Sequence, residues 1–520
     1  MNRNVMLALL SESARPWDVL VIGGGATGLG IAVDAASRGF RTALLEQHDF
    51  AKGTSSRSTK LIHGGLRYLK QGNLRLVRES LRERGLLLRN APHLVSPLPF
   101  LIPCYRTGES AFYGLGLKMY DALAGRLAIQ GAKHLTALEA TAELPELRQD
   151  GLRAGVLYWD GQFDDAALAL CLARTAVDLG ATVVNYFPVV RLLKNAGRIC
   201  GVVGRDAESG NEYEVRARAV VNATGIFADR VCQLDEAITP VTMSPSRGAH
   251  IVLDKKFLSG RTALMIPKTT DKRVLFAIPW HGRVLVGTTD TAVNEVGLEP
   301  APAVEEINFL LEQVGAYLTQ APRREDILSQ FAGLRPLVRS AHGAKSALIP
   351  RDHSISVSPS GLLTITGGKW TTYRKMAEDA VDRLVKMGAV PERACVTDSL
   401  HLHGWTASNA PAREDGLRPY GSDAQPMLEL ADGKPGLLEQ IHPALPYRAL
   451  EIVWEIRNGM AVHLEDILAR RTRALFLDAR AAMECAPRVA SIMSNELGQG
   501  KDWEEKEIKA FAEVAKKYLG

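Results

Sequence analysis

A chain of 520 residues exceeds the roughly 250–300 residues at which a single hydrophobic core stops growing, so we expect two or more packed units. Hydrophobic residues make up 46% and charged residues 23% of the chain, the proportions of an ordinary globular protein, which exclude a disordered or collagen-like chain. The 63 Lys and Arg against 58 Asp and Glu leave a net charge of only +5. No basic run resembles a nucleic-acid-binding arm, so nucleic acid is not an expected partner.

No apolar stretch approaches the roughly 18 residues that span a bilayer, and the run 5–10 is too short for a secretory signal. The sequence therefore predicts a cytoplasmic protein. The six cysteines lie far apart without a Cys-x-x-Cys pair, which predicts buried thiols rather than disulfides or a zinc site. His401 and His403 form only an isolated His-x-His in a loop, so we expect no metal.

The first regular elements form a βαβ pattern. Residues 18–22 are a β-branched apolar run closed by glycines, an Ala-rich helical pattern continues through Ser37, and a second strand covers 42–45. This opening favours an α/β architecture with a parallel sheet. Further strands at 218–221, 283–286 and 362–366 predict that the sheet is assembled from distant segments, and 74–90 reads as an amphipathic helix.

The last part of the chain has a different composition. Residues 398–447 are rich in Pro, Gly, Asp and Ser, which predicts a linker. Residues 448–485 and 502–519 then read as helices of a C-terminal domain.

A glycine motif between the first strand and helix predicts a nucleotide site. Gly23, Gly25 and Gly28 form G-x-G-x-x-G, and Glu46 follows at the end of the next strand. Gly23 suits the tight turn, Gly25 the close approach of a pyrophosphate, and Gly28 the close packing of the helix. Glu46 can accept both ribose hydroxyls and would repel a 2′-phosphate, which disfavours NADP. NAD and the ADP half of FAD both remain open on this motif.

Several longer motifs stand out: GTSSRSTKLIHGGLRYLK at 53–70, NATG at 222–225, GTTD at 287–290, GLRP at 333–336 and GGKWTTYR at 367–374. Together they resemble one family, the FAD-dependent (aerobic, respiratory) glycerol-3-phosphate dehydrogenases. The segment 463–482 is similar to the C-terminal domain of their mitochondrial-type branch, and we expect no calcium-binding tail beyond Gly520.

The resemblance implies a D-amino-acid-oxidase-like fold, in which a discontinuous Rossmann-like FAD-binding domain carries a substrate cap and an all-α C-terminal domain follows. The oxidoreductase region is expected over 1–397, the linker over 398–447 and the helical domain over 448–520. Within the first region, FAD-binding segments are expected at 17–90, 150–240 and 335–390, and cap segments at 91–149 and 241–334.

The resemblance also implies the activity: oxidation of sn-glycerol 3-phosphate to dihydroxyacetone phosphate by hydride transfer to noncovalent FAD, with electrons passed to membrane quinone. The enzyme would then be peripherally bound to the inner face of the cytoplasmic membrane, and a homodimer is compatible with this assignment. The long insertion typical of the oxygen-using glycerophosphate oxidases is missing between Pro336 and Gly367, which favours the dehydrogenase. An oxidase that makes peroxide and a non-catalytic flavoprotein sensor remain the alternatives.

Site residues follow from the same motifs. His63 is the candidate base because imidazole is naturally poised near neutral pH, and His250 is its rival. Arginine suits a phosphate through two parallel hydrogen bonds, and Arg335 could also polarise the substrate oxygen. The expected substrate-binding residues are Arg67, Tyr68, Arg335 and Arg351. The expected cofactor-binding residues are Gly23, Gly25, Gly28, Glu46, Thr54, Ser55, Ala223, Gly225, Gly368, Lys369 and Thr371.

Overall fold

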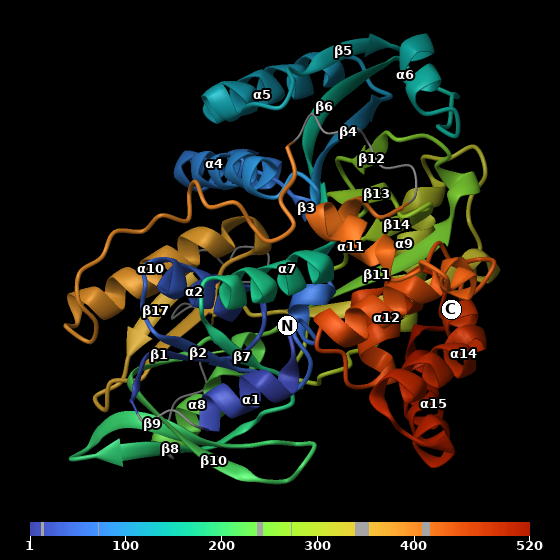
Figure 1. Ribbon diagram of the computed structural model, residues 1–520. Helices are drawn as coiled ribbons and strands as arrows, with labels where there is room; N and C mark the ends of the chain where they lie inside the picture. The colour runs from blue at the N-terminus through green and yellow to red at the C-terminus, as the bar shows by residue number, and fades with distance from the viewer. Residues whose placement is uncertain (12–14, 71, 237–242, 272, 339–352, 408–415) are drawn as a thin grey trace.

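Figure 1 shows the computed structural model of the chain, which describes all residues except 12–14, 71, 237–242, 272, 339–352 and 408–415. Two β-sheets dominate the molecule. The first occupies the lower left of the view with α1 and α8, and the second extends toward the upper right. The C-terminal helices, drawn in red, lie along the right-hand side.

The first sheet joins strands from the N-terminal region with strands from far along the chain. Its order is β17-β18-β10-β1-β2-β7, and β1 pairs in parallel with both β2 and β10. The predicted parallel sheet and its assembly from distant segments are therefore confirmed. Its strands are β1 (Trp17–Ile22), β2 (Thr42–Leu45), β7 (Thr182–Val184), β10 (Glu212–Asn222), β17 (His353–Val357) and β18 (Leu363–Gly367), with β8 (Val189–Asn195) and β9 (Arg198–Arg205) joined through β10.

Helices cover this sheet. α2 (Ala26–Ser37) follows β1 directly, as predicted, and its almost continuous Ala, Gly and aliphatic sequence lets it pack closely between two neighbours. These are α7 (Asp165–Asp178) and α10 (Tyr373–Lys386). α1 (Arg3–Ser11) packs on β7 and β10, and α8 (Ala228–Asp235) packs on β18.

The second sheet is mainly antiparallel, in the order β15-β11-β14-β13-β12-β4-β6-β3, with β16 on β11 and β5 on β6. Its strands are β3 (Leu61–Ile62), β4 (Val95–Cys104), β5 (Lys133–Thr136), β6 (Ala154–Phe163), β11 (Ser246–Asp254), β12 (Ala263–Ile266), β13 (Leu275–Trp280), β14 (Arg283–Gly287), β15 (Thr291–Ala292) and β16 (Ile327–Arg335). Its helices are α3 (Leu66–Lys70), α4 (Leu74–Asn90), α5 (Glu109–Ala124), α6 (Ala137–Glu143) and α9 (Val304–Gly315).

Two strands depart from the expected segments. β6 lies inside 150–240 and β3 inside 17–90, both assigned to the FAD-binding part, yet β6 pairs with β4 along its whole length and β3 pairs with β6 in the second sheet. An apolar strand pattern predicts a strand without indicating which sheet the strand joins, and that is the reason for the difference. The domain boundaries themselves stay predictions.

The C-terminal region is helical but interrupted. Asp466 accepts hydrogen bonds from the backbone N–H groups of Val462 and His463, and Asp478 caps the next helix by accepting one from Ala481. Asp478 starts a new helix as its N-cap, because its side chain replaces the missing backbone partner, whereas Asp466 binds the N–H groups of residues that precede its own helical turn. The pieces are α11 (Ala424–Glu429), α12 (Ala449–Asn458), the π-helical turn η10 (Asp466–Arg471), α13 (Ala474–Leu477), α14 (Ala479–Leu497) and α15 (Lys501–Ala515).

These C-terminal helices pack on the second sheet. The ring of Phe476 lies 4.8 Å from Phe331 of β16 and 5.2 Å from Tyr518. Ser329 Oγ, also on β16, donates to the carbonyl of Leu475 at 2.9 Å. The helices and the sheet therefore share one hydrophobic core.

Candidate active site

One large cavity of about 590 Å³ lies where the two sheets meet. It is lined both by the carboxyl end of β1 and the start of α2 and by strands of the second sheet. Fourteen of the predicted site residues line it: Gly23, Gly25, Glu46, Thr54, Ser55, His63, Tyr68, Ala223, Gly225, His250, Arg335, Gly368, Lys369 and Thr371. The fold thus brings together residues that are separated by more than 300 positions in the sequence.

Three predicted residues are placed differently. Gly28 lies under the glycine turn, where an added Cβ would come within 1.9 Å of Gly23 O, so its role is close packing. Arg67 belongs to α3, but its side chain is outside the described part of the chain. Arg351 also lies outside the described residues.

The glycine turn has the geometry that a dinucleotide needs. Gly23 has φ of +112°, a backbone conformation that L side chains rarely adopt. Gly25 is the N-cap of α2, and the N–H of Ala26 at the first helical position donates to Ser55 Oγ at 2.9 Å. The positive end of the helix dipole at this turn favours a phosphate. An added Cβ at Gly25 would meet only Ser55 Oγ, at 3.1 Å. The space beside Gly25 is therefore open to a bound group.

Glu46 lines the cavity next to the glycine turn. Its Oε2 accepts from Gly24 N at 2.5 Å and its Oε1 accepts from His48 N at 2.9 Å. Burial raises the pKa of Glu46 to about 6, although both backbone hydrogen bonds oppose the shift. Each carboxylate oxygen has a second lone pair, so acceptance of ribose hydroxyls stays a prediction that the geometry permits.

In another part of the cavity wall, the GGKW turn meets the His63 segment. His63 N donates to Thr371 Oγ1 at 3.3 Å, and Trp370 Nε1 donates to the carbonyl of Ser55 at 2.9 Å. Lys369 Nζ lies 5.2 Å from the centre of the Tyr68 ring, a cation–π contact. This part of the cavity wall therefore combines the positive charge of Lys369 with the imidazole of His63.

Arg335 is the last residue of β16 and lines the cavity. Its guanidinium donates to Thr289 O at 2.9 Å and to Thr288 Oγ1 at 3.1 Å. Asp290 Oδ1 lies 3.3 Å from Nη1 of the same guanidinium. These contacts fix the direction of the Arg335 side chain, which is the condition for using it to orient a ligand.

His250 is buried beside the same cavity. Its Nε2 lies 2.9 Å from Thr59 Oγ1, and its ring stacks on Phe331 with centres 4.8 Å apart. Burial, together with the positive charges of Lys60 and Arg335, lowers the pKa of His250 well below 6.5. His250 is therefore held neutral.

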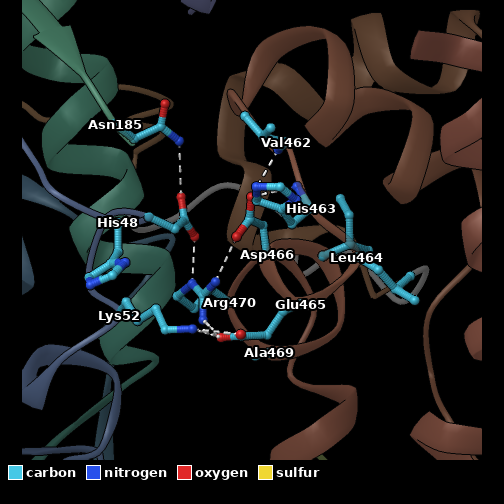
Figure 2. Close-up of polar contacts among 12 residues, drawn as sticks. His48, Lys52, Asn185, Val462, His463, Leu464, Glu465, Asp466, Ala469 and Arg470 are labelled. Carbon is cyan, nitrogen blue, oxygen red and sulfur yellow. Dashed lines mark hydrogen bonds and ion pairs between the residues drawn. The ribbon is translucent and has the colours of Figure 1, made fainter. Parts of the chain in front are cut away.

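The loop 46–57, which supplies much of the cavity wall, is held by the C-terminal region. Asp49 is fully buried and accepts from the guanidinium groups of Arg470 and Arg471, including Arg471 Nη2 to Oδ1 at 2.8 Å. Figure 2 shows Arg470 also meeting Glu465, to which Lys52 Nζ donates at 2.7 Å. We call Lys52, Asp49, Glu465, Asp466, Arg470 and Arg471 the loop clasp. Its formal charges sum to zero.

Arg471→Met is expected to destabilise the protein by about 3–5 kcal/mol, because removing one partner leaves an uncompensated negative charge buried in the loop clasp. The loop should loosen at the same time, so the variant should also retain less flavin on gel filtration. Arg488→Met is the matched control, since Arg488 is exposed, forms an ion pair with the exposed Glu439 and donates to the carbonyl of Gln440. The control should change the free energy of unfolding by no more than about 1 kcal/mol. Equal unfolding temperatures for the two variants would contradict this role.

The loop clasp also predicts a pH dependence. Burial alone would raise the pKa of Asp49, but Arg471 and Arg470 together lower it to about 2. A carboxyl with a lowered pKa in the folded state adds stability above its unfolded pKa of about 3.9 and loses it as the pH falls toward 2. Acid unfolding of the wild-type protein should therefore steepen below pH of about 4, and Arg471→Met should show less of this change.

Sequence reasoning missed several residues of the cavity wall. Lys52, Arg57 and Asp290 line the cavity and lie in or beside motifs that the sequence already singles out. Asp160, on β6, also lines it. The signal for Asp160 was a single acid at a buried position of an otherwise apolar and aromatic strand, which indicates a paired carboxylate.

The donor set of the cavity fits FAD. The start of α2 and the buried carboxylate of Glu46 suit a pyrophosphate and a ribose. The part of the wall formed by Lys369 and His63 suits a ring that takes up negative charge. Both parts line one cavity, as a bound dinucleotide requires.

Comparison with known proteins agrees with this geometry. Residues 18–374 match the family described as FAD dependent oxidoreductase, and residues 363–507 match the C-terminal domain of alpha-glycerophosphate oxidase. The mitochondrial glycerol-3-phosphate dehydrogenase of Mesocricetus auratus is 39% identical over 551 residues, covering 100% of this chain and 75% of that protein. The mitochondrial glycerol-3-phosphate dehydrogenase of Arabidopsis thaliana is also 39% identical, covering 98% of this chain and 87% of its own.

A solved structure shows the same fold. The glycerol-3-phosphate dehydrogenase from Bacillus halodurans, complexed with FAD, superimposes with a TM-score of 0.80 at 29% sequence identity. The superposition covers 100% of this chain and 98% of that one. Because the similarity extends over both the cavity-forming sheets and the C-terminal helices, the chain belongs to the FAD-dependent glycerol-3-phosphate dehydrogenase family of oxidoreductases.

Proposed function

We propose that this protein oxidises sn-glycerol 3-phosphate to dihydroxyacetone phosphate and passes the electrons to a quinone in the membrane. The observation that carries the proposal is the single cavity in which His63, Arg335 and Lys369 meet a dinucleotide-binding turn. FAD, bound noncovalently, supplies the acceptor for the hydride from C2. The chain must then bind the phosphate, orient C2 and remove the hydroxyl proton.

We assign His63 as the base that accepts the hydroxyl proton of the substrate. A neutral imidazole can accept a hydroxyl proton near neutral pH, and the backbone of His63 is fixed by Thr371 in the cavity wall. His250 is the weaker candidate because its buried, positively charged surroundings oppose the protonated form that a base must adopt. Thr59 also occupies its Nε2.

We assign binding of the substrate phosphate, and contact with the substrate oxygen at C2, to arginine side chains. Arg335 is directed into the cavity by Asp290 and the Thr288–Thr289 segment, and Arg67, Tyr68 and Arg351 complete the proposed anion site. Lys369, with the backbone of Gly368 and Thr371, favours negative charge on the flavin ring.

Arg335→Ala is expected to lower the efficiency of substrate use by about ten- to a hundredfold, since a lost hydrogen bond to a charged group costs roughly 1.5–3 kcal/mol. Flavin content should not change, because Arg335 is held by Thr288, Thr289 and Asp290 of the second-sheet region. The measurement is steady-state oxidation of glycerol 3-phosphate at matched flavin concentration. Arg283→Ala, a change at a surface arginine bonded to the Ala444 carbonyl, is the control. Wild-type kinetics for Arg335→Ala would remove Arg335 from the anion site.

The proposed membrane contact has a candidate surface. None of the helices in the described part of the chain is long and apolar enough to cross a membrane. Helix α5 exposes Phe112 and Leu115 at 61% and 73%, and α6, the next α-helix along the chain, exposes Leu138 at 82%. The same part of the chain carries the exposed Lys118 on α5 and the exposed Lys133 on β5. Exposed apolar side chains and lysines suit the surface of an anionic lipid bilayer, where the quinone is dissolved.

An acceptor panel tests the function. Purified enzyme with glycerol 3-phosphate should reduce a short-chain quinone much faster than it forms peroxide in air, and glycerol without phosphate should be a poor donor. Anionic vesicles should bind the enzyme more tightly than zwitterionic ones, and Leu115→Glu should weaken that binding while Leu438→Glu, at another exposed leucine, should not. Peroxide formed at the full turnover rate without quinone activity would identify an oxidase instead. Absence of turnover with every acceptor would favour a sensor.

A further inference from the structure

A cluster of three buried polar side chains lies behind the turn that carries His63. Tyr120 comes from α5, Asp160 from β6 and Arg84 from α4, and their exposed fractions are 0%, 2% and 2%. Neither the predicted site nor the proposed reaction uses them. Buried polar groups are costly unless they are paired, so their contacts indicate what they do.

The three side chains form a chain of hydrogen bonds that ends on the turn. Arg84 Nη1 donates to Asp160 Oδ1 at 2.6 Å, and Tyr120 OH donates to Asp160 Oδ2 at 2.8 Å. The Tyr120 oxygen in turn accepts from the backbone N–H of Gly64 at 2.7 Å. Gly64 directly follows His63, so the cluster holds the backbone next to the candidate base.

The direction of these bonds is fixed. Burial, together with the neighbouring Asp160, raises the pKa of Tyr120 well above 10, so the phenol keeps its one proton. Asp160, paired with Arg84, takes that proton in a hydrogen bond, and the phenol oxygen remains as the acceptor for Gly64. A phenylalanine at position 120 would leave the Gly64 N–H without this acceptor.

The turn is also confined on its other sides. Thr371 Oγ1 accepts from His63 N at 3.3 Å on the cavity side. A Cβ added at Gly64 would lie 2.6 Å from both Tyr120 OH and Leu81 Cδ2, so the backbone is packed closely against α4 and α5. Gly65 has φ of +81°, which allows the sharp change of direction after Gly64. Hydrogen bonds from Gly64 to Tyr120 and from His63 to Thr371 therefore both hold the backbone of the turn.

We propose that Tyr120, fixed by Asp160 and Arg84, is a positioning residue that holds the His63–Gly65 turn in the orientation used for substrate oxidation. This inference rests on the proposed function, because that function makes His63 the base. It concerns residues of α4, α5 and β6, of which Tyr120 contacts the backbone of the turn and acts through His63.

Tyr120→Phe tests the role, with Tyr113→Phe as the control that removes the same atom from the same helix. Hydrogen exchange of the peptide that covers residues 61–66 is measured in apoprotein and in FAD-loaded protein. The amide of Gly64 should exchange about two- to tenfold faster in Tyr120→Phe, the effect of one lost hydrogen bond. The limiting rate of flavin reduction by glycerol 3-phosphate should fall by about the same factor or more, while the half-saturating substrate concentration and the flavin content stay unchanged.

The outcomes separate this role from a general structural one. Exchange at 61–66 that equals the wild-type rate, or faster exchange with an unchanged reduction rate, would overturn the proposal. A fall in unfolding temperature with faster exchange over the whole chain would overturn it as well. If Tyr120→Phe does not fold, Asp160→Asn is measured in the same way, since it removes the charge that orients both neighbours. If wild-type protein is not reduced by glycerol 3-phosphate, the proposed function fails, but the exchange experiment still decides whether Tyr120 holds the turn.

Discussion

His63→Ala should slow reduction of the bound flavin by about 10²–10⁴-fold, because a positioned general base contributes an acceleration of this size. Anaerobic stopped-flow mixing with glycerol 3-phosphate isolates this half-reaction from the acceptor step. The ionisation that the imidazole contributes to the pH profile of reduction should disappear with it. Flavin content should stay normal, since the glycine turn and Glu46 are not changed.

The control for this prediction is His401→Ala. His401 is exposed and stacks on Trp405, with ring centres 3.9 Å apart, away from the cavity wall. This variant should be reduced at the wild-type rate. If His63→Ala is also reduced at the wild-type rate, His63 is not the base and His250 becomes the leading candidate.

Gly25→Val should give a folded protein that has lost most of its FAD. A Cβ added at Gly25 meets only Ser55 Oγ within 4 Å, at 3.1 Å, so we expect the fold to accept the side chain, but it fills the space beside the first turn of α2 that the pyrophosphate needs. Flavin absorbance per protein and the far-ultraviolet circular dichroism spectrum measure the two effects separately. Normal flavin content would refute the assignment of Gly25.

Two further glycine variants make this result specific. Gly28→Val should fail at folding, because its Cβ would lie 1.9 Å from Gly23 O. Gly116→Val, on α5, should keep both fold and flavin, because nothing lies within 4 Å of its added Cβ. The three variants therefore distinguish loss of the cofactor, disruption of the glycine turn and a change without effect.

Local pattern allowed prediction of the first βαβ unit. The strand 18–22, the helix through Ser37 and the strand 42–45 match β1, α2 and β2 closely, because hydrophobic periodicity and glycine chemistry act over a few residues. The motifs 53–70 and 367–374 could be assigned to one site only through the family resemblance. Spacing along the chain does not show that Thr371 and His63 meet.

Contacts between distant segments could not be predicted. Asp49 and Arg471 are 422 positions apart, and an acid in a loop and an arginine in a helix each look like ordinary surface residues. Asp160 and Tyr120 likewise gain their meaning only when β6 joins the second sheet beside α5. The burial of such groups and the identity of their partners both depend on the tertiary structure.

The loop clasp affects when the protein can bind FAD during its synthesis on the ribosome. Chains grow at roughly 5–20 residues per second, so the loop 46–57 leaves the ribosome about 20–80 seconds before Arg470 and Arg471 are synthesised. During that interval Asp49 has none of the arginine partners that lower its pKa, and the nucleotide-binding wall lacks its support. The first sheet can form early, but tight loading with FAD has to wait until the last tenth of the chain has emerged. Nascent chains stalled before residue 465 should therefore be isolated largely without flavin.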